Sequence, residues 1–139
     1  MHFSNFFRFM ETAEHAFLRS LGFSAVLSRN GLAVCLPRVH AECDYLAPLR
    51  FEDEVLIHLL VERKGERSLT YQFRFHQANG PGSMEVARGQ VTAACAARQP
   101  DGTLKAACLP KSIADQIQEA PRHMLFDIRS RSGRRLAGT

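Results

Sequence analysis

Hydrophobic side chains recur at intervals of three and four along residues 4–21. The recurring positions are Phe6, Phe7, Met10, Ala13, Phe17, Leu18 and Leu21. That spacing places them on one side of an α-helix. Ser4 is a suitable N-cap, and Gly22 follows the last periodic residue as a C-terminal stop. The pattern therefore predicts one long helix whose wide aromatic face must be covered.

From residue 32 onward the pattern is that of β-strands. Residues 68–77 alternate strictly, so Leu69, Tyr71, Phe73 and Phe75 are predicted to share one face of a sheet. The predicted elements are a loop at 23–31, strands at 32–36, 39–46, 54–63, 68–77 and 85–98, and a short helix at 111–119 capped by Ser112. Gly89 interrupts the last strand and is typical of a bulge or of a close approach by backbone or ligand. One helix followed by hairpin-connected strands predicts an α+β fold, with the helix on an antiparallel sheet.

Charge is distributed unevenly along the 139 residues. Residues 1–121 carry 13 basic and 13 acidic side chains, whereas residues 122–139 hold five arginines and one acid. This distribution predicts one neutral domain at residues 1–120 and a solvated basic tail at 121–139. It argues against a nucleic-acid-binding domain, which would carry a basic face on the fold. We therefore expect that cutting the chain after Glu119 leaves folding intact.

Cysteines and hydropathy bear on the cellular compartment. The four cysteines show no metal-ligand spacing, so we interpret them as free thiols in a reducing compartment and expect no metal. No apolar run approaches the roughly 20 residues of a membrane helix, and no signal peptide is visible. These features favour a cytoplasmic protein with no membrane association.

Four segments, in this order, resemble the 4-hydroxybenzoyl-CoA thioesterase family. Asn5–Ala13 is similar to its Asn-aromatic helix motif, and Tyr45–Val55 to its strand, proline turn and entry to the next strand. Arg67–Ser68 and Ala87–Gly89 resemble the openings and glycine of its later strands. The resemblance implies a hotdog fold, in which an antiparallel sheet wraps a long helix, and hydrolysis of an acyl-CoA thioester.

The same resemblance implies a catalytic aspartate that the sequence does not contain. In the family a β-strand and an Asp-x-Asp-x-x-Gly segment precede the helix motif, and counting back from Asn5 puts the second Asp a few residues before Met1. Either the true start lies upstream or the protein lacks the first strand and its Asp. We expect the upstream start, because a missing strand exposes a sheet edge.

Two carboxylates on the predicted helix are the remaining candidates for the chemistry. Glu14 falls within the apolar stripe and Glu11 at its edge. A carboxylate in an apolar stripe is costly unless it is paired or functional. A second branch of hotdog thioesterases uses a helix-borne Glu as base or nucleophile. The alternative is an ion pair with an arginine, such as Arg8 at a spacing of three from Glu11, or Arg38 through space.

The resemblance implies further site residues. His2 and Asn5 lie at the helix start, where free N–H groups can stabilise an oxyanion, and Ser68 is expected to reach the site from a neighbouring subunit. Coenzyme A carries phosphates, so cations should flank its cleft. The candidate coenzyme A contacts are Arg63, Lys64, Arg67, Arg88 and Gly89.

The leading hypothesis is an acyl-CoA thioesterase that acts as a homodimer or homotetramer, on an aromatic or aliphatic acyl group. It needs no cofactor besides the coenzyme A of its substrate. The alternative is a non-catalytic hotdog protein that binds an acyl chain or a partner and lacks the catalytic Asp.

Overall fold

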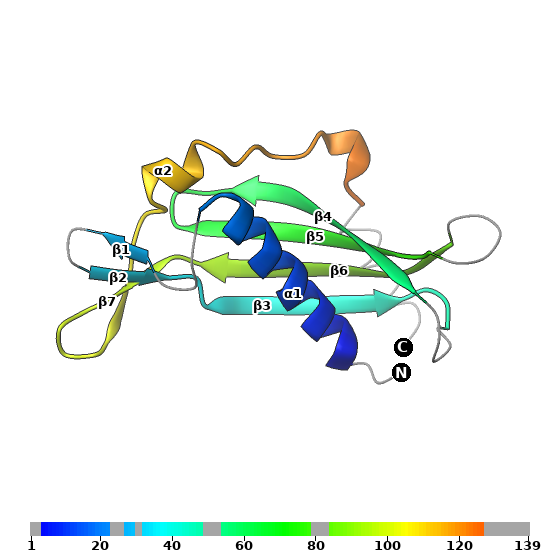
Figure 1. Cartoon of the computed structure of the whole chain (residues 1–139), viewed down its shortest axis with the longest axis horizontal. Coiled ribbons are helices and arrows are strands. Elements are labelled where there is room, and N and C mark those ends of the chain that lie inside the picture. Colours follow the sequence, from blue (N-terminus) through cyan, green and yellow to red (C-terminus); the bar gives the residue numbers. More distant parts are fainter. Residues whose placement is uncertain (1–3, 23–26, 30–31, 49–53, 79–83, 127–139) are drawn as a thin grey trace, which may run out of the picture.

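A computed structural model describes residues 4–22, 27–29, 32–48, 54–78 and 84–126 of the chain. Its elements in chain order are α1 (Ser4–Ser20), β1 (Leu27–Arg29), β2 (Leu32–Cys35), β3 (Arg38–Tyr45), β4 (Val55–Lys64), β5 (Ser68–Gln77), β6 (Glu85–Ala94), β7 (Ala96–Arg98), β8 (Leu104–Ala106), α2 (Lys111–Ala114) and a 3-10 turn, Arg122–Met124. The long helix lies across the sheet, as predicted (Figure 1). No helix of the described ranges is long and apolar enough to cross a membrane.

The described strands form two antiparallel sheets. The larger has the order β3-β6-β5-β4, and the smaller has the order β1-β2-β7-β8. The chain leaves the larger sheet after β6 and enters the smaller one at β7, with Cys95 between them. This break divides the single strand predicted at 85–98. The three-residue strands β1 and β8 were not predicted, because so few residues give no measurable period.

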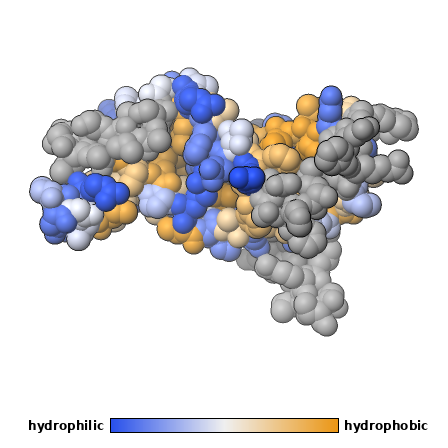
Figure 2. Space-filling view, turned by 60° about the horizontal axis from the view of Figure 1, so that its bottom comes forward, coloured by the Kyte–Doolittle hydropathy of each residue, from blue (hydrophilic) through white to orange (hydrophobic). Residues whose placement is uncertain are grey.

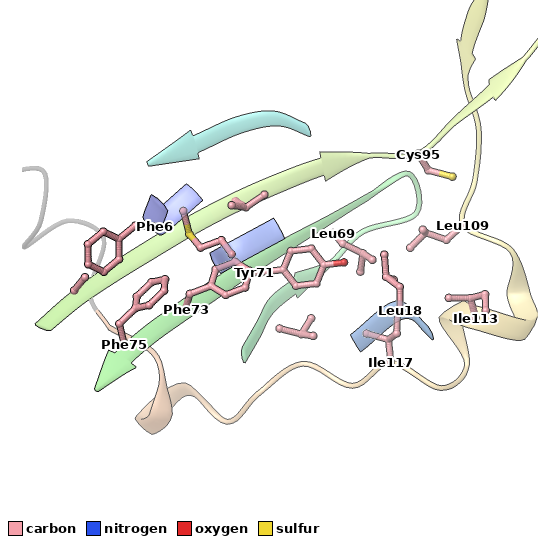
Figure 3. Close-up of a cluster of buried hydrophobic side chains, with 14 of the residues drawn as sticks. Phe6, Leu18, Leu69, Tyr71, Phe73, Phe75, Cys95, Leu109, Ile113 and Ile117 are labelled. Atoms are coloured by element: carbon pink, nitrogen blue, oxygen red, sulfur yellow. The ribbon is translucent and has the colours of Figure 1, made fainter. Parts of the chain in front are cut away.

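The helix side of the larger sheet holds the core. Tyr71, Phe73 and Phe75 of β5 have no exposed surface, and they point toward α1, as the alternation predicted (Figure 3). Met10 of α1 lies over Gly89 of β6 so closely that a Cβ at position 89 would collide with the Met10 sulfur. Gly89 therefore serves the close approach of helix and sheet.

The opposite face of the sheet is polar and partly covered by the C-terminal segment. One oxygen of Glu62 accepts hydrogen bonds from the side-chain amides of Gln72 and Gln90, at 2.7 and 2.9 Å. The Gln72 amide also pairs with both backbone groups of Phe126, at 2.9 and 3.2 Å. The Phe126 ring is stacked under the guanidinium groups of Arg74 and Arg88, 5.6 and 5.7 Å from its centre.

This packing changes the expectation for the predicted tail. Residues 121–126 are attached to the sheet, and Phe126 is only 6% exposed. Apolar periodicity does not reveal such a segment, because a single aromatic ring and a backbone pairing hold it. The structure therefore leads us to expect that cutting after Glu119 weakens the fold. The helix predicted at 111–119 is also shorter, since α2 ends at Ala114 and no side chain caps its start.

One edge of the larger sheet belongs to β3. Among the described strands, β3 pairs only with β6. Val39 is 64% exposed, and Tyr45 and Leu46 at the end of the strand are each 39% exposed. Figure 2 turns the lower edge of Figure 1 forward and shows hydrophobic surface on both sides of a hydrophilic band. This edge of the described sheet thus presents exposed apolar side chains.

Candidate active site

Glu14 is the single buried carboxylate among the described residues. It is 2% exposed and lies one turn from Met10 and from Leu18, which are also buried. One of its oxygens accepts a hydrogen bond from the Arg38 guanidinium at the start of β3. The helical periodicity predicted that Glu14 falls within the apolar stripe. The ion pair with Arg38, which the sequence left open as the alternative to a catalytic role, is present.

The other oxygen of Glu14 has no hydrogen-bond partner among the described residues, and neither has the Tyr71 hydroxyl. The two groups nevertheless influence each other. Burial raises the pKa of the Glu14 carboxyl, and the nearby Arg38, Tyr71 and His15 lower it only in part. Burial, and then the charge of Glu14, raise the pKa of the Tyr71 hydroxyl, so it keeps its proton. The raised pKa makes the Glu14 carboxylate a stronger base than an exposed glutamate, which favours a role in proton transfer.

Glu11 occupies a different environment. Its side chain is 56% exposed, and its nearest cation, Arg38, lies 3.8 Å away. Solvent screens such a pair. Arg38 therefore bridges two carboxylates, of which only Glu14 is withdrawn from water.

The helix start lies apart from Glu14. Asn5 belongs to the first turn of α1, but its side chain and all of His2 fall outside the described residues. Nine residues separate Asn5 from Glu14, which is roughly 13 Å along a helix. Within one subunit, the N–H groups of the first turn and the Glu14 carboxyl therefore cannot act on the same bond.

Aromatic rings surround Phe6 at the same end of the helix. Its ring centre lies 5.0 Å from Tyr45, 5.1 Å from Phe75 and 6.0 Å from Phe9. Phe6 is 5% exposed and belongs to the core, whereas Phe7 is 40% exposed. Phe7 is therefore the helix aromatic that remains open to a ligand.

Three of the predicted cations cluster at the β4–β5 turn. Arg63 and Arg67 are exposed there. Lys64 instead donates to the carbonyl oxygens of Ala114 and Ile117, both at 2.9 Å, and so fixes α2. Ser68 begins β5 beside the same turn. An open pocket of about 430 Å³ adjoins it, lined by Lys64, Gly65, Glu66, Cys108, Leu109, Lys111 and Ala114.

Arg88 and Gly89 are separated from that turn and from each other. Arg88 lies on the polar face and binds Glu85 at 2.8 Å, opposite Arg74 of β5. Arg74 is six residues from Ser68, about 20 Å along a strand. Gly89 faces the helix under Met10. The structure thus does not gather the predicted coenzyme A contacts into one cluster.

Tyr71 was not identified from the sequence as a site residue. Its place in the alternation marked it as core, and that prediction is confirmed. The available signal was its chemistry, since a tyrosine on an otherwise apolar face brings a hydroxyl into the core. Which group meets that hydroxyl depends on how α1 crosses the sheet.

Comparisons with known proteins agree with this architecture. The family model of the thioesterase superfamily matches residues 1–83. A putative esterase of Aquifex aeolicus (strain VF5) is 38% identical over 74 residues. That match covers 52% of this chain and 56% of the Aquifex protein, so it spans little more than half of each.

Solved structures share the fold. A 1,4-dihydroxy-2-naphthoyl-CoA thioesterase from Synechocystis has a TM-score of 0.66, with 24% identity and 84% coverage of each chain. A 4-hydroxybenzoyl-CoA thioesterase bound to 4-hydroxybenzoyl-CoA has a TM-score of 0.69, with 13% identity, 83% coverage of this chain and 84% of that one. A gentisyl-coenzyme A thioesterase has a TM-score of 0.65, with 23% identity, 81% coverage of this chain and 85% of that one. The likeness confirms the hotdog fold expected from the sequence.

Proposed function

Because the chain belongs to the thioesterase superfamily, we propose that it hydrolyses the thioester of an acyl-CoA, with Glu14 as the general base. The observation that carries the proposal is the buried Glu14 carboxyl, which has one oxygen held by Arg38 and a raised pKa. The Asp-x-Asp-x-x-Gly segment that the family resemblance implies does not occur in these 139 residues. Glu14 is the carboxylate of the described chain whose surroundings suit the chemistry.

In the proposed reaction Glu14 removes a proton from water as the water oxygen bonds to the thioester carbonyl carbon. The C–S bond then breaks, coenzyme A leaves as a thiolate, and the proton on Glu14 passes to sulfur. The products are a carboxylic acid and the coenzyme A thiol. The Arg38 side chain is 30% exposed, so it connects the buried carboxyl with solvent. We place the approach of the thioester along Arg38, where its positive charge also favours the developing oxyanion.

Coenzyme A binding is proposed at the β4–β5 turn. Arg63 and Arg67 are exposed there, and arginine suits phosphate because its planar fork donates two parallel hydrogen bonds. Lys64 is held by carbonyl oxygens of the α2 region, so we assign it to the shape of the turn. The acyl group is aromatic or aliphatic, and Phe7 is the helix residue placed to contact it.

Assembly as a homodimer or homotetramer is part of the proposal. The edge position of β3 and its exposed apolar side chains support it, since an edge strand is a template for pairing with another chain. Ser68 is proposed to contribute to the site of a neighbouring subunit. Analytical ultracentrifugation measures the mass of the assembly, and a monomer at micromolar concentration would contradict this part.

The test compares Glu14→Gln with Glu11→Gln on benzoyl, short-chain and long-chain acyl-CoA, with a chromogenic reporter for the released thiol. Both carboxylates neighbour Arg38, so Glu11→Gln is a matched control. We expect Glu14→Gln to lower kcat at least tenfold and Glu11→Gln to change it less than twofold. The reverse result would assign the base to Glu11. Full activity in both variants would exclude both helix carboxylates as the base. Inactive but folded wild-type protein would favour the non-catalytic binder.

A further inference from the structure

Two unpartnered polar atoms are buried together beneath α1. They are the second carboxyl oxygen of Glu14 and the hydroxyl of Tyr71, whose residues are 2% and 0% exposed. The third such atom in the described ranges, Nδ1 of His76, belongs to a residue on the opposite face of the sheet. Buried polar groups are nearly always hydrogen-bonded, so two unpaired ones at one place call for an explanation.

Their chemistry is complementary. The Glu14 carboxylate can only accept hydrogen bonds, and the Tyr71 phenol can donate one. Arg38 occupies one Glu14 oxygen and leaves the other available. The Tyr71 ring packs on Phe17, three residues after Glu14 on α1, so Tyr71 lies beside the helix turn that carries Glu14. Each group also shifts the pKa of the other.

Tyr71 is also held in place. Its ring lies 5.9 Å from that of Phe73 on the same strand and 6.1 Å from that of Phe17 on α1. Figure 3 shows the hydroxyl among apolar side chains of the core. A donor on a ring that cannot turn away has a fixed direction, which is what orientation of a reacting group requires.

We propose that Tyr71 is a positioning residue for Glu14, whose hydroxyl donates to the carboxyl oxygen that Arg38 leaves free. The carboxylate is then held from β3 by a cation and from β5 by a neutral donor. This inference rests on the proposed function, since it assigns to Tyr71 the orientation of the base. It adds a residue that neither touches substrate nor carries charge.

The charged groups around Glu14 come from two elements. Arg38 lies at the start of β3, and Glu11 and His15 lie on α1. The Tyr71 hydroxyl stabilises the ionised carboxyl, as Arg38 does. Its removal should therefore raise the pKa of Glu14 and move the acid limb of the pH–rate profile to higher pH.

The test is Tyr71→Phe, which removes only the hydroxyl. We expect kcat to fall about tenfold, as for loss of a hydrogen bond to a charged group, with KM changed less than twofold and the acid limb moved upward. Tyr45→Phe makes the same chemical change at the other tyrosine of the chain, and we expect it to move neither kcat nor the limb. In the double variant with Glu14→Gln, the Tyr71 change should cost nothing further, because Tyr71 acts through Glu14.

A second measurement separates this inference from the proposed function. Carbon-13 NMR titration of the Glu14 carboxyl in wild-type and Tyr71→Phe protein reads the interaction without any substrate. A higher Glu14 pKa in the variant supports the inference even if the protein hydrolyses no thioester. An unchanged Glu14 pKa in the variant overturns the inference. So does an active Tyr71→Phe enzyme with unchanged kcat and acid limb. If only the melting temperature changes, Tyr71 is a core residue and does not position Glu14.

Discussion

Met10 of α1 occupies the space where a side chain at position 89 would begin, so Gly89 determines how closely the helix approaches the sheet. Met10 is 1% exposed and has neighbours on all sides. A methyl group added at position 89 must displace either the Met10 sulfur or the whole helix. The two residues are thus one packing unit, although 79 positions of sequence separate them.

We predict that Gly89→Ala lowers the free energy of unfolding by about 1–3 kcal/mol, the usual cost of overpacking a core. Urea titration measures this change. Met10→Ala provides the control, because the double variant should lose less than the sum of the two single losses. Additive losses would show that Met10 and Gly89 do not compete for one space.

Phe126→Ala should lower the free energy of unfolding by about 3–5 kcal/mol, since it removes a buried ring and two cation–π contacts. Phe7→Ala is the matched control, because Phe7 is 40% exposed and should change stability by less than about 1 kcal/mol. Equal effects of the two changes would mean that the C-terminal segment does not contribute to the fold.

The stability of the protein should respond to pH through Glu14. Its pKa is raised by burial above the ordinary value of 4.5, so the folded state favours the protonated form. Protonated Glu14 therefore contributes to the free energy of unfolding below pH 4.5, and this contribution is lost as the pH rises through the pKa of Glu14 in the folded state. We therefore expect Glu14→Gln to gain stability relative to wild type as the pH rises. Chemical unfolding at a series of pH values tests this, and a constant difference between the two proteins would contradict it.

Glu85 should respond in the opposite sense. Burial alone would raise the pKa of its carboxyl, but the hydrogen bond and charge of Arg88, with those of Arg74, lower it below 4.5. The stabilisation is present above pH 4.5 and is lost as the pH falls through the folded pKa. Glu85→Gln should thus be less stable than wild type at neutral pH, and the two should converge in acid. A persistent difference at low pH would show that the carboxyl acts other than by its charge.

Arg67 at the β4–β5 turn and Arg88 on the polar face of the sheet should differ in their effect on KM. Arg67→Ala is expected to raise KM for an acyl-CoA severalfold, because a phosphate contact is lost. It should leave KM unchanged for the same acyl group on N-acetylcysteamine, which has no phosphate. Arg88→Ala should lower stability but leave both KM values unchanged, since Arg88 is held by Glu85 and Phe126. A higher KM for acyl-CoA in Arg88→Ala would return that residue to the coenzyme A site.

Periodicity was most informative where elements are long. The predicted strand at 68–77 coincides with β5, and the predicted helix ends one residue beyond α1. The position of Glu14 inside the stripe followed from the same spacing. Long elements repeat their pattern often enough for chance to average out.

The contacts that the sequence did not reveal join distant segments through single side chains. Phe126 is bound by an amide on β5 and two guanidinium groups, none of which alters a local pattern. Tyr71 meets Glu14 only because α1 crosses the sheet at one particular angle. Arg88 was assigned to the coenzyme A contacts because it directly precedes Gly89. Adjacent residues of a strand, however, face opposite sides of the sheet.

The shared oxygen of Glu62 has a consequence for how this face can change over time. One acceptor serves two buried amides, those of Gln72 and Gln90, so losing it strands two donors at once. Replacing either glutamine first leaves the other still attached. Substitutions at this face should therefore be tolerated at either glutamine before they are tolerated at the glutamate.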